Sequence, residues 1–271
     1  MSFQTLLQVV EKCDNFPHAL PSYLNPPKSD SHDDEPLNTH VLRVGSAIVG
    51  RLLPSTVTAI QEYNARQTGD PPFVIGDGCV TFDEHIHTPE ERSRIIEGLL
   101  RTWVEEKRFV ALKGWRNELL SAYGDMTQPD NIAFVFERAG AAVLGIPSYG
   151  VHLNAYIRDE NGDLNMWIAR RSPTKQTWPG MLDNCVAGGI AHGLAVYETV
   201  VKECEEEASI PAEIARKARN VGAISYFLVT PNGLQPETQY IFDIELPKEV
   251  IPKPSDGEVE AFYLWDMTEV T

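Results

Sequence analysis

The chain has 271 residues and a formal net charge of −16, with 42% hydrophobic and 23% charged residues. These proportions are typical of a globular protein with room for two domains that each have a core. The negative charge argues against binding to a nucleic-acid backbone, which depends on clustered Lys and Arg. No run of residues approaches the ~20 apolar positions of a membrane span, so we expect no membrane partner.

The four cysteines are far apart and form no CxxC pair, which predicts reduced thiols rather than a metal finger or a disulfide framework. The N-terminal sequence MSFQTLLQVVEKCDNF lacks the basic segment and cleavage site of a secretory signal. We therefore expect a cytoplasmic protein.

The first half of the chain predicts a mixture of short strands and helices. A Pro-, Asp- and Ser-rich connection is expected over residues 15–38. The expected elements are helices over 1–14, 54–67, from Thr88 to about 106 and over 132–146, and strands within 40–53, 73–82 and 109–114.

The second half begins near residue 148, where we place the domain boundary. Residues 151–159 and 164–172 flank a Glu-Asn-Gly-Asp turn and predict a β-hairpin. An acidic helix follows, and then strands over 226–229 and 239–246. This order predicts an α/β sandwich with a mixed sheet.

The acidic helix is the most informative segment. Residues 188–210 read GGIAHGLAVYETVVKECEEEASI, in which Glu203, Glu206 and Glu207 share one side of a helix. Like charges at this spacing repel one another, so a bound cation would stabilise them. Oxygen ligands favour Mg2+ or Mn2+. The other side of the helix carries Tyr197, Val201, Cys204 and Ala208, at the spacing of a buried stripe. The alternative is an ordinary solvated acidic helix.

This segment resembles the Nudix box, G-x5-E-x7-R-E-U-x-E-E-x-G-U, where U is apolar. Gly188, the three glutamates and Ile210 match the box. Leu194, Lys202 and Ser209 depart from it, at positions where the box has Glu, Arg and Gly. Lys202 keeps the positive charge but lacks the planar bidentate donor of Arg.

Flanking segments resemble one branch of Nudix proteins, which is related to the thiamine diphosphate hydrolases associated with thiamine pyrophosphokinase in fungi. These segments are GWRNELLSAYG, FERAGAAVLGIPSYGVHLNAY, WIARRSPTKQTWPGMLDNCVAGGIAHG, LQPETQYIFDIEL and PSDGEVEAFYLW. The resemblance implies an α+β accessory domain over residues 1–148 that contributes to the substrate cleft. It also implies a Nudix α/β/α sandwich over 149–271, truncated at its C-terminal helix, and fusion to or association with the pyrophosphokinase.

The resemblance also implies the roles of the acidic residues. Glu203, Glu206 and Glu207, with a backbone carbonyl of the turn at Gly188, would be the metal ligands. Glu258 would be the general base, although Glu206 is an alternative and an acidic turn without catalytic function is equally consistent with the sequence. In a strand, Glu258 and Glu260 would point the same way.

Basic and aromatic residues are the candidates for substrate binding. Arg170 and Lys175 precede the box and could contact phosphate, although exposed basic residues often serve only solubility. Trp115, Gln239 and Tyr240 could stack on or hydrogen-bond a heterocycle, and so could Trp178, although such residues more often pack in a core or on a surface.

We therefore predict a metal-dependent hydrolase that converts thiamine diphosphate, or its oxidised or damaged analogues, to the monophosphate and phosphate. One alternative is another Nudix reaction, on a nucleoside or other organic diphosphate or as an isopentenyl-diphosphate-type isomerase using Cys185. The other is a non-catalytic module that binds thiamine phosphates within a fused pyrophosphokinase.

Overall fold

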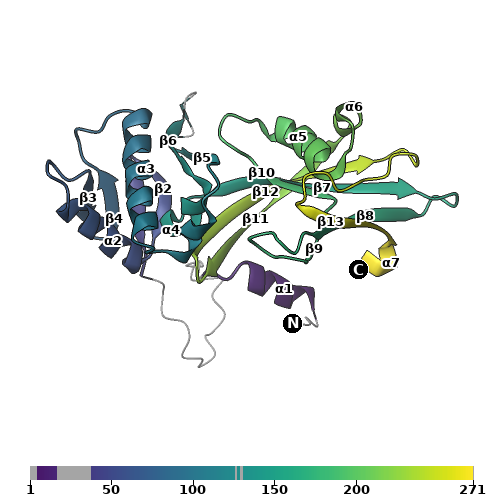
Figure 1. Cartoon of the computed structure of the whole chain (residues 1–271), viewed down its shortest axis with the longest axis horizontal. Helices are drawn as coiled ribbons and strands as arrows, with labels where there is room; N and C mark the ends of the chain where they lie inside the picture. Colours follow the sequence, from purple (N-terminus) through teal and green to yellow (C-terminus); the bar gives the residue numbers. More distant parts are fainter. Residues whose placement is uncertain (1–4, 17–37, 126, 129–130, 271) are drawn as a thin grey trace, which may run out of the picture. The chain divides into compact units, whose positions relative to one another are not determined.

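The computed structural model describes residues 5–16, 38–125, 127–128 and 131–270 (Figure 1). It divides into two compact units, of which the first comprises Met1–Pro147 and Tyr226–Pro236 and the second Ser148–Ser225 and Glu237–Thr271. The predicted connection over 15–38 falls almost entirely outside the described residues. Among the described helices, none is long and apolar enough to cross a membrane.

The first unit combines a four-stranded sheet, in the order β2-β1-β4-β3, with a separate two-stranded sheet of β5 and β6. Its buried core includes Leu42, Ile96, Trp103 and Phe134. Its elements are α1 (Leu6–Cys13), β1 (His40–Val44), β2 (Ala47–Leu52), α2 (Pro54–Ala65), β3 (Phe73–Gly76), β4 (Cys79–Phe82), α3 (Pro89–Glu105), η1 (Val110–Gly114), β5 (Leu119–Tyr123), β6 (Ile132–Glu137), η2 (Arg138–Gly140) and α4 (Ala141–Leu144).

The predicted start of α3 is confirmed by its cap. The Thr88 side chain accepts a hydrogen bond from the Glu91 N–H, and the Glu91 carboxylate accepts one from the Thr88 N–H. This reciprocal capping box, followed by Pro89 in the first turn, satisfies donors that a helix start leaves unpaired.

Two predictions for the first unit are wrong. Residues 110–114 form the 3₁₀ helix η1 rather than a strand. The helix predicted over 132–146 is instead β6, followed by η2 and α4. The sequence IAFVFE is rich in aromatic and β-branched residues, and it pairs with β5, so strand pairing outweighs the helical spacing read from the sequence.

The second unit is built on a seven-stranded mixed sheet. Its path is β11-β12-β7-β8-β13, with β10 pairing with β7 and β9 with β8. Figure 1 shows α5 and α6 on one side of this sheet. The elements are β7 (Ser148–Arg158), β8 (Leu164–Arg171), β9 (Leu182–Asp183), β10 (Val186–Gly189), α5 (Val196–Ala208), α6 (Ala212–Ala215), β11 (Arg219–Thr230), β12 (Gly233–Glu245), β13 (Val259–Asp266) and α7 (Met267–Val270). The end of β11 and the start of β12, within Tyr226–Pro236, belong to the first unit.

The predicted hairpin of β7 and β8 and the predicted α/β fold are therefore confirmed. The β7 side chains alternate between the two faces of the sheet. Val151, Leu153 and Ala155 are buried in the core of the second unit together with Val200 and Cys204 of α5. This packing holds the acidic helix against the sheet.

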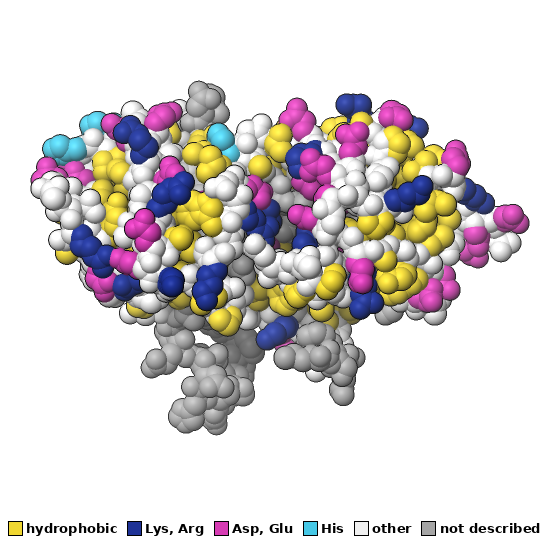
Figure 2. All heavy atoms as spheres, viewed as in Figure 1, with side chains coloured by type: hydrophobic (Ala, Val, Ile, Leu, Met, Phe, Trp, Pro, Cys, Tyr) yellow, Lys and Arg dark blue, Asp and Glu magenta, His cyan; other side chains and the backbone are white. Residues whose placement is uncertain are grey.

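Charged side chains of both signs are interspersed on the described surface shown in Figure 2. On that face, acidic and basic side chains alternate and do not gather in one acidic patch.

Candidate metal and diphosphate site

Helix α5 carries the three predicted acidic residues, but the structure separates them by burial. Glu207 is only 4% exposed, and the side chain of Glu203 is 14% exposed, whereas that of Glu206 is 51% exposed. The buried face includes Val200, Cys204, Ala208 and Glu207 itself. The predicted stripe was therefore wrong at Tyr197, which is 41% exposed.

Strand β10 positions the two inward glutamates. The N–H of Ala187 donates a hydrogen bond of 3.0 Å to Glu207. Gly188 lies directly beneath Glu203, because a Cβ at position 188 would lie 2.4 Å from Glu203 Cδ. Glycine at this position therefore lets the Glu203 side chain lie against the strand. The structure places residues 187–188 in a strand, not in the turn that the sequence predicted.

A second segment brings further carboxylates to α5. Carboxylate oxygens of Glu207, Asp256 and Glu258 lie within 4.8 Å of one another. Glu258 directly precedes β13, and its N–H donates to the Asp256 side chain (2.8 Å). Sequence reasoning missed Asp256, although the Ser-Asp-Gly turn before Glu258 contains it.

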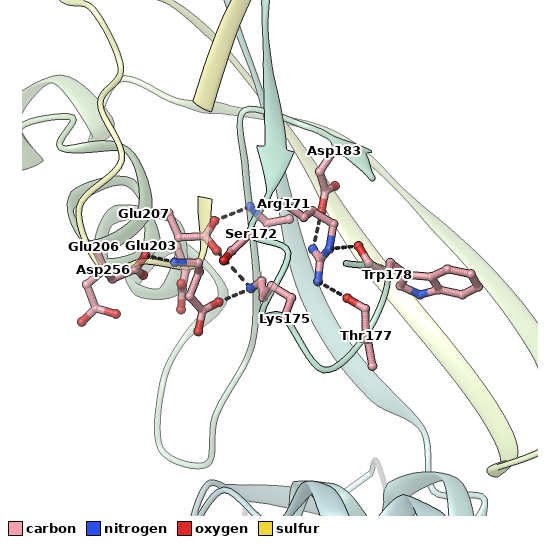
Figure 3. A network of polar contacts seen from close by, with 12 residues as sticks. Arg171, Ser172, Lys175, Thr177, Trp178, Asp183, Glu203, Glu206, Glu207 and Asp256 are labelled. Carbon is pink, nitrogen blue, oxygen red and sulfur yellow. Dashed lines mark hydrogen bonds and ion pairs between the residues drawn. The ribbon is translucent and has the colours of Figure 1, made fainter. Parts of the chain in front are cut away.

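Lys175 reaches into this acidic group. Its Nζ lies 3.7 Å from Glu207 and forms an ion pair with Glu258, and its side chain is only 16% exposed. Figure 3 shows Lys175 pointing toward the carboxylates, whereas the indole of Trp178 points away from them. The structure thus brings a predicted phosphate-binding residue, a predicted metal ligand and the predicted base together.

Arg171 holds the loop that carries Lys175. Its guanidinium pairs with Asp183 (2.6 Å) and donates to the backbone carbonyls of Thr177 (3.0 Å) and Trp178 (3.1 Å). Through these three contacts, visible in Figure 3, the planar guanidinium joins the middle of the loop to Asp183 of β9.

Arg170, the arginine predicted to bind phosphate, has a different position. It forms an exposed ion pair with Glu260 (3.2 Å). The pairing of β8 and β13 shifts register between Val259 and Ala261, so Glu260 lies in an irregularity of the strand. Glu258 and Glu260 have different partners, Lys175 and Arg170. That their side chains point the same way stays a prediction.

The residues predicted to bind the organic group are dispersed. Trp115 belongs to the first unit, where Arg101 lies over its ring at 4.9 Å and its indole N–H donates to Asn117. Tyr240 packs against the core of the second unit. Gln239 lies over Gly150, where a Cβ would meet its Oε1 at 2.1 Å. Their roles in substrate binding stay predictions.

Burial changes the acidity of the inward carboxyls. It raises the pKa of Glu207 to about 7, although the Ala187 N–H and the Lys175 ammonium act in the opposite direction. It also raises the pKa of Glu203, against the opposing effect of Lys202. Carboxylates that are desolvated and close together are stabilised by a bound cation.

The donor set therefore fits a hard divalent metal ion. Glu207, Asp256 and Glu258 converge, and Glu203 lies on the same helix as Glu207; all four offer only oxygen atoms, as Mg2+ and Mn2+ prefer. Lys202 bridges Glu203 (3.1 Å) and Glu206 (2.5 Å), so the lysine that replaces the Arg of the box still contacts two carboxylates. The side chain of Glu206 is half exposed, so Glu206 suits a contact with a metal-bound water molecule rather than with the metal itself.

Two family models match the two halves of the chain. A model described as "Domain of unknown function (DUF4743)" matches residues 8–148, and the NUDIX domain model matches residues 148–270. The chain belongs to the DUF4743 family and carries a Nudix domain. The Nudix superfamily predicted from the box is thus confirmed.

Several curated proteins are similar to this Nudix protein. Nudix hydrolase 20, chloroplastic, of Arabidopsis thaliana is 39% identical over 208 residues, which cover 77% of this chain and 54% of that protein. Nudix hydrolase 24, chloroplastic, of the same plant is 36% identical over 193 residues, covering 71% and 51%. An isopentenyl-diphosphate Delta-isomerase of Salmonella arizonae is 28% identical over 109 residues, covering 40% and 57%.

The chain spans about half the length of the two plant relatives. Their names place those proteins in the chloroplast, and the cytoplasmic location expected for this chain stays a prediction.

Proposed function

We propose that this protein is a metal-dependent diphosphate hydrolase whose site consists of Glu203, Glu207, Asp256, Glu258 and Lys175. The observation that carries the proposal is the convergence of buried Glu207 with Asp256, Glu258 and Lys175, because a cation and a phosphate can then meet at one place. The bound metal would neutralise the diphosphate and acidify a water molecule. Gly188 and Glu206 support the metal ligands in this proposal.

The protein groups have separate tasks in this reaction. Glu203 and Glu207 hold the metal from the rigid helix α5, and Lys175 binds a phosphate oxygen as a point charge. Glu258, whose side chain is half exposed, accepts the proton of the attacking water. In-line substitution at phosphorus requires mainly this positioning and charge compensation.

The substrate class that we propose is thiamine diphosphate or its oxidised or damaged forms. This part is supported by the resemblance of the segments around residues 114–124, 136–156 and 234–246 to the thiamine-related Nudix branch. The proposed partner is accordingly a small organic diphosphate. A link to a thiamine pyrophosphokinase belongs to the same proposal.

The isomerase alternative is less well supported by the site. It requires a thiol that reaches the substrate, but Cys185 is fully buried, and burial raises the pKa of its thiol well above the ordinary value. Metal-dependent release of phosphate from a diphosphate would exclude the non-catalytic alternative.

The decisive experiment measures phosphate release from thiamine diphosphate by the full chain, with and without Mg2+. Glu207→Gln should lower the Mg2+-dependent rate by more than about a hundredfold, because it removes a ligand charge while keeping the side-chain shape. Glu205→Gln, on the exposed face of the same helix, is the matched control and should retain the rate. Wild-type turnover that does not require metal, or equal rates for both variants, would contradict the proposal.

A further inference from the structure

Strand β7 pairs with two different strands along one side. Its first part pairs with β10, with His152 opposite Ala187, and its last part pairs with β8 from Ala155 onward. Asn184 precedes β10 at the point where β10 and β8 separate. The sheet therefore forks at this position, within the second unit.

Four polar side chains form a hydrogen-bonded row at the fork. The Asn154 amide donates to Asp243 (2.9 Å), the Asn184 amide donates to Asn154 (2.5 Å), and His152 Nδ1 bonds to the Asn184 carbonyl oxygen (2.6 Å). We call His152, Asn154, Asn184 and Asp243 the fork cluster. All four residues are half-buried.

The fork cluster lies on the sheet face opposite α5. The neighbouring β7 residues Val151, Leu153 and Ala155 pack in the core with that helix, and successive side chains of a strand point to opposite faces. Asp243 is the direct partner of Asn154 in the pairing of β12 with β7, so the two side chains share a face.

The carboxylate of Asp243 sets the direction of the whole row. Because it only accepts hydrogen bonds, it orients the Asn154 amide, which in turn orients Asn184 and leaves His152 Nδ1 as the donor. The second N–H of each amide, the second oxygen of Asp243 and the imidazole Nε2 are not used within this row. This face of the sheet thus presents hydrogen-bond donors and acceptors in alternation.

The fork cluster is directly connected to the metal site. Ala187, opposite His152, donates its N–H to Glu207. The Asn184 N–H bonds to Asp183, which pairs with Arg171, and Arg171 holds the loop of Lys175. The fork cluster therefore lies one strand away from the backbone N–H that holds Glu207, on the other face of the sheet.

We propose that the fork cluster binds the organic group of the diphosphate substrate, and that this group is a planar nitrogen heterocycle carrying an amino group. The amino group donates to Asp243, and ring nitrogens accept from the amides of Asn154 and Asn184. Gln239 lies on the same face, beside Gly150, and can extend the row. This inference rests on the proposed function, since it assigns the specificity of the same site.

The test compares thiamine diphosphate with methyl diphosphate, which lacks a heterocycle, using the full chain and Mg2+. Asp243→Asn keeps the side-chain shape but replaces one of the two acceptor oxygens with an N–H donor, so the side chain can no longer accept from Asn154 and from the substrate amino group together. It should raise KM for thiamine diphosphate at least about tenfold and change methyl diphosphate hydrolysis less than about twofold. Asp163→Asn, in the β7–β8 turn, is the matched control. Equal effects of Asp243→Asn on both substrates, or no effect on either, would overturn the proposal.

A binding measurement separates this inference from the proposed hydrolysis. Thiamine, cytidine and adenosine are titrated calorimetrically into the metal-free wild-type chain and into Asp243→Asn. Binding of at least one heterocycle that the variant loses supports the fork site even if no diphosphate is hydrolysed. Absence of binding by all three would overturn it. Should Asp243→Asn fail to fold, Asn154→Ala, which removes an amide that the proposal assigns to the ring nitrogens, replaces it and should likewise lose the binding.

Discussion

Lys175 Nζ lies 3.7 Å from a carboxylate oxygen of Glu207, so an ammonium group occupies the region where the proposed metal would bind. The same ammonium pairs with Glu258. Lys175 therefore competes with a metal ion for the carboxylates in the metal-free protein and is available to a phosphate once the metal is bound.

Replacing Lys175 with Met should have opposite effects on metal and substrate. Mg2+ should bind more tightly, because the competing cation is gone, whereas KM for the diphosphate should rise about tenfold, because a charge-assisted hydrogen bond is lost. Calorimetry and steady-state kinetics measure the two effects. Lys217→Met, at an exposed position near α6, is the control; weaker Mg2+ binding by Lys175→Met would contradict the competition.

The raised pKa of Glu207 predicts how stability depends on pH without metal. The carboxyl titrates near 4.5 when unfolded and at about 7 when folded, so the native state binds more protons between these values. The protonated Glu207 carboxyl contributes at most about 3 kcal/mol to the free energy of unfolding. This contribution is fully present below pH 4.5 and is lost as pH rises through 7. Urea unfolding at several pH values measures it.

The comparison that isolates this effect uses Glu207→Gln and added Mg2+. The variant should be more stable than wild type at pH 8 and should lack the decline between pH 5 and 7.5. Saturating Mg2+ should abolish the decline in wild type as well, because the ion binds the charged carboxylate. A wild-type decline that Glu207→Gln retains would assign the titration to another group.

Adding a methyl group at Gly188 should disrupt the metal site with limited damage to the fold. The new Cβ would collide with Glu203 Cγ and Cδ, each 2.4 Å away, and the side chain can rotate outward. We expect Mg2+ affinity to fall at least about tenfold in Gly188→Ala. Gly76→Ala, whose Cβ would meet only an atom 3.9 Å away, serves as the control for a glycine in a strand.

The thiols should react in two classes. Cys13 is exposed and Cys79 partly exposed, whereas Cys185 and Cys204 are buried. Burial also raises the pKa of Cys204 to about 12, so its reactive thiolate is scarce. An aromatic disulfide reagent should modify two thiols in the native protein and all four in denaturant. Rapid native modification of Cys185 would revive the isomerase alternative.

Local patterns were sufficient to predict much of the second unit. The hairpin of β7 and β8 follows from alternating apolar residues around a Gly-containing turn, and α5 from its helical spacing. Local patterns failed at residues 132–137, which become β6 because they pair with β5. The pairing of two strands, even of neighbours such as β5 and β6, is not encoded in the periodicity of either strand alone.

By itself, the sequence determined that Glu203, Glu206 and Glu207 lie on one helix, because residues three and four apart are neighbours there whatever the rest of the fold does. Only the tertiary structure decided that Glu207 is buried, that Asp256, Glu258 and Lys175 surround it, and that Arg170 pairs elsewhere. These outcomes depend on the packing of β10, the Lys175 loop and the segment before β13, and that packing is set by contacts between residues far apart in the chain.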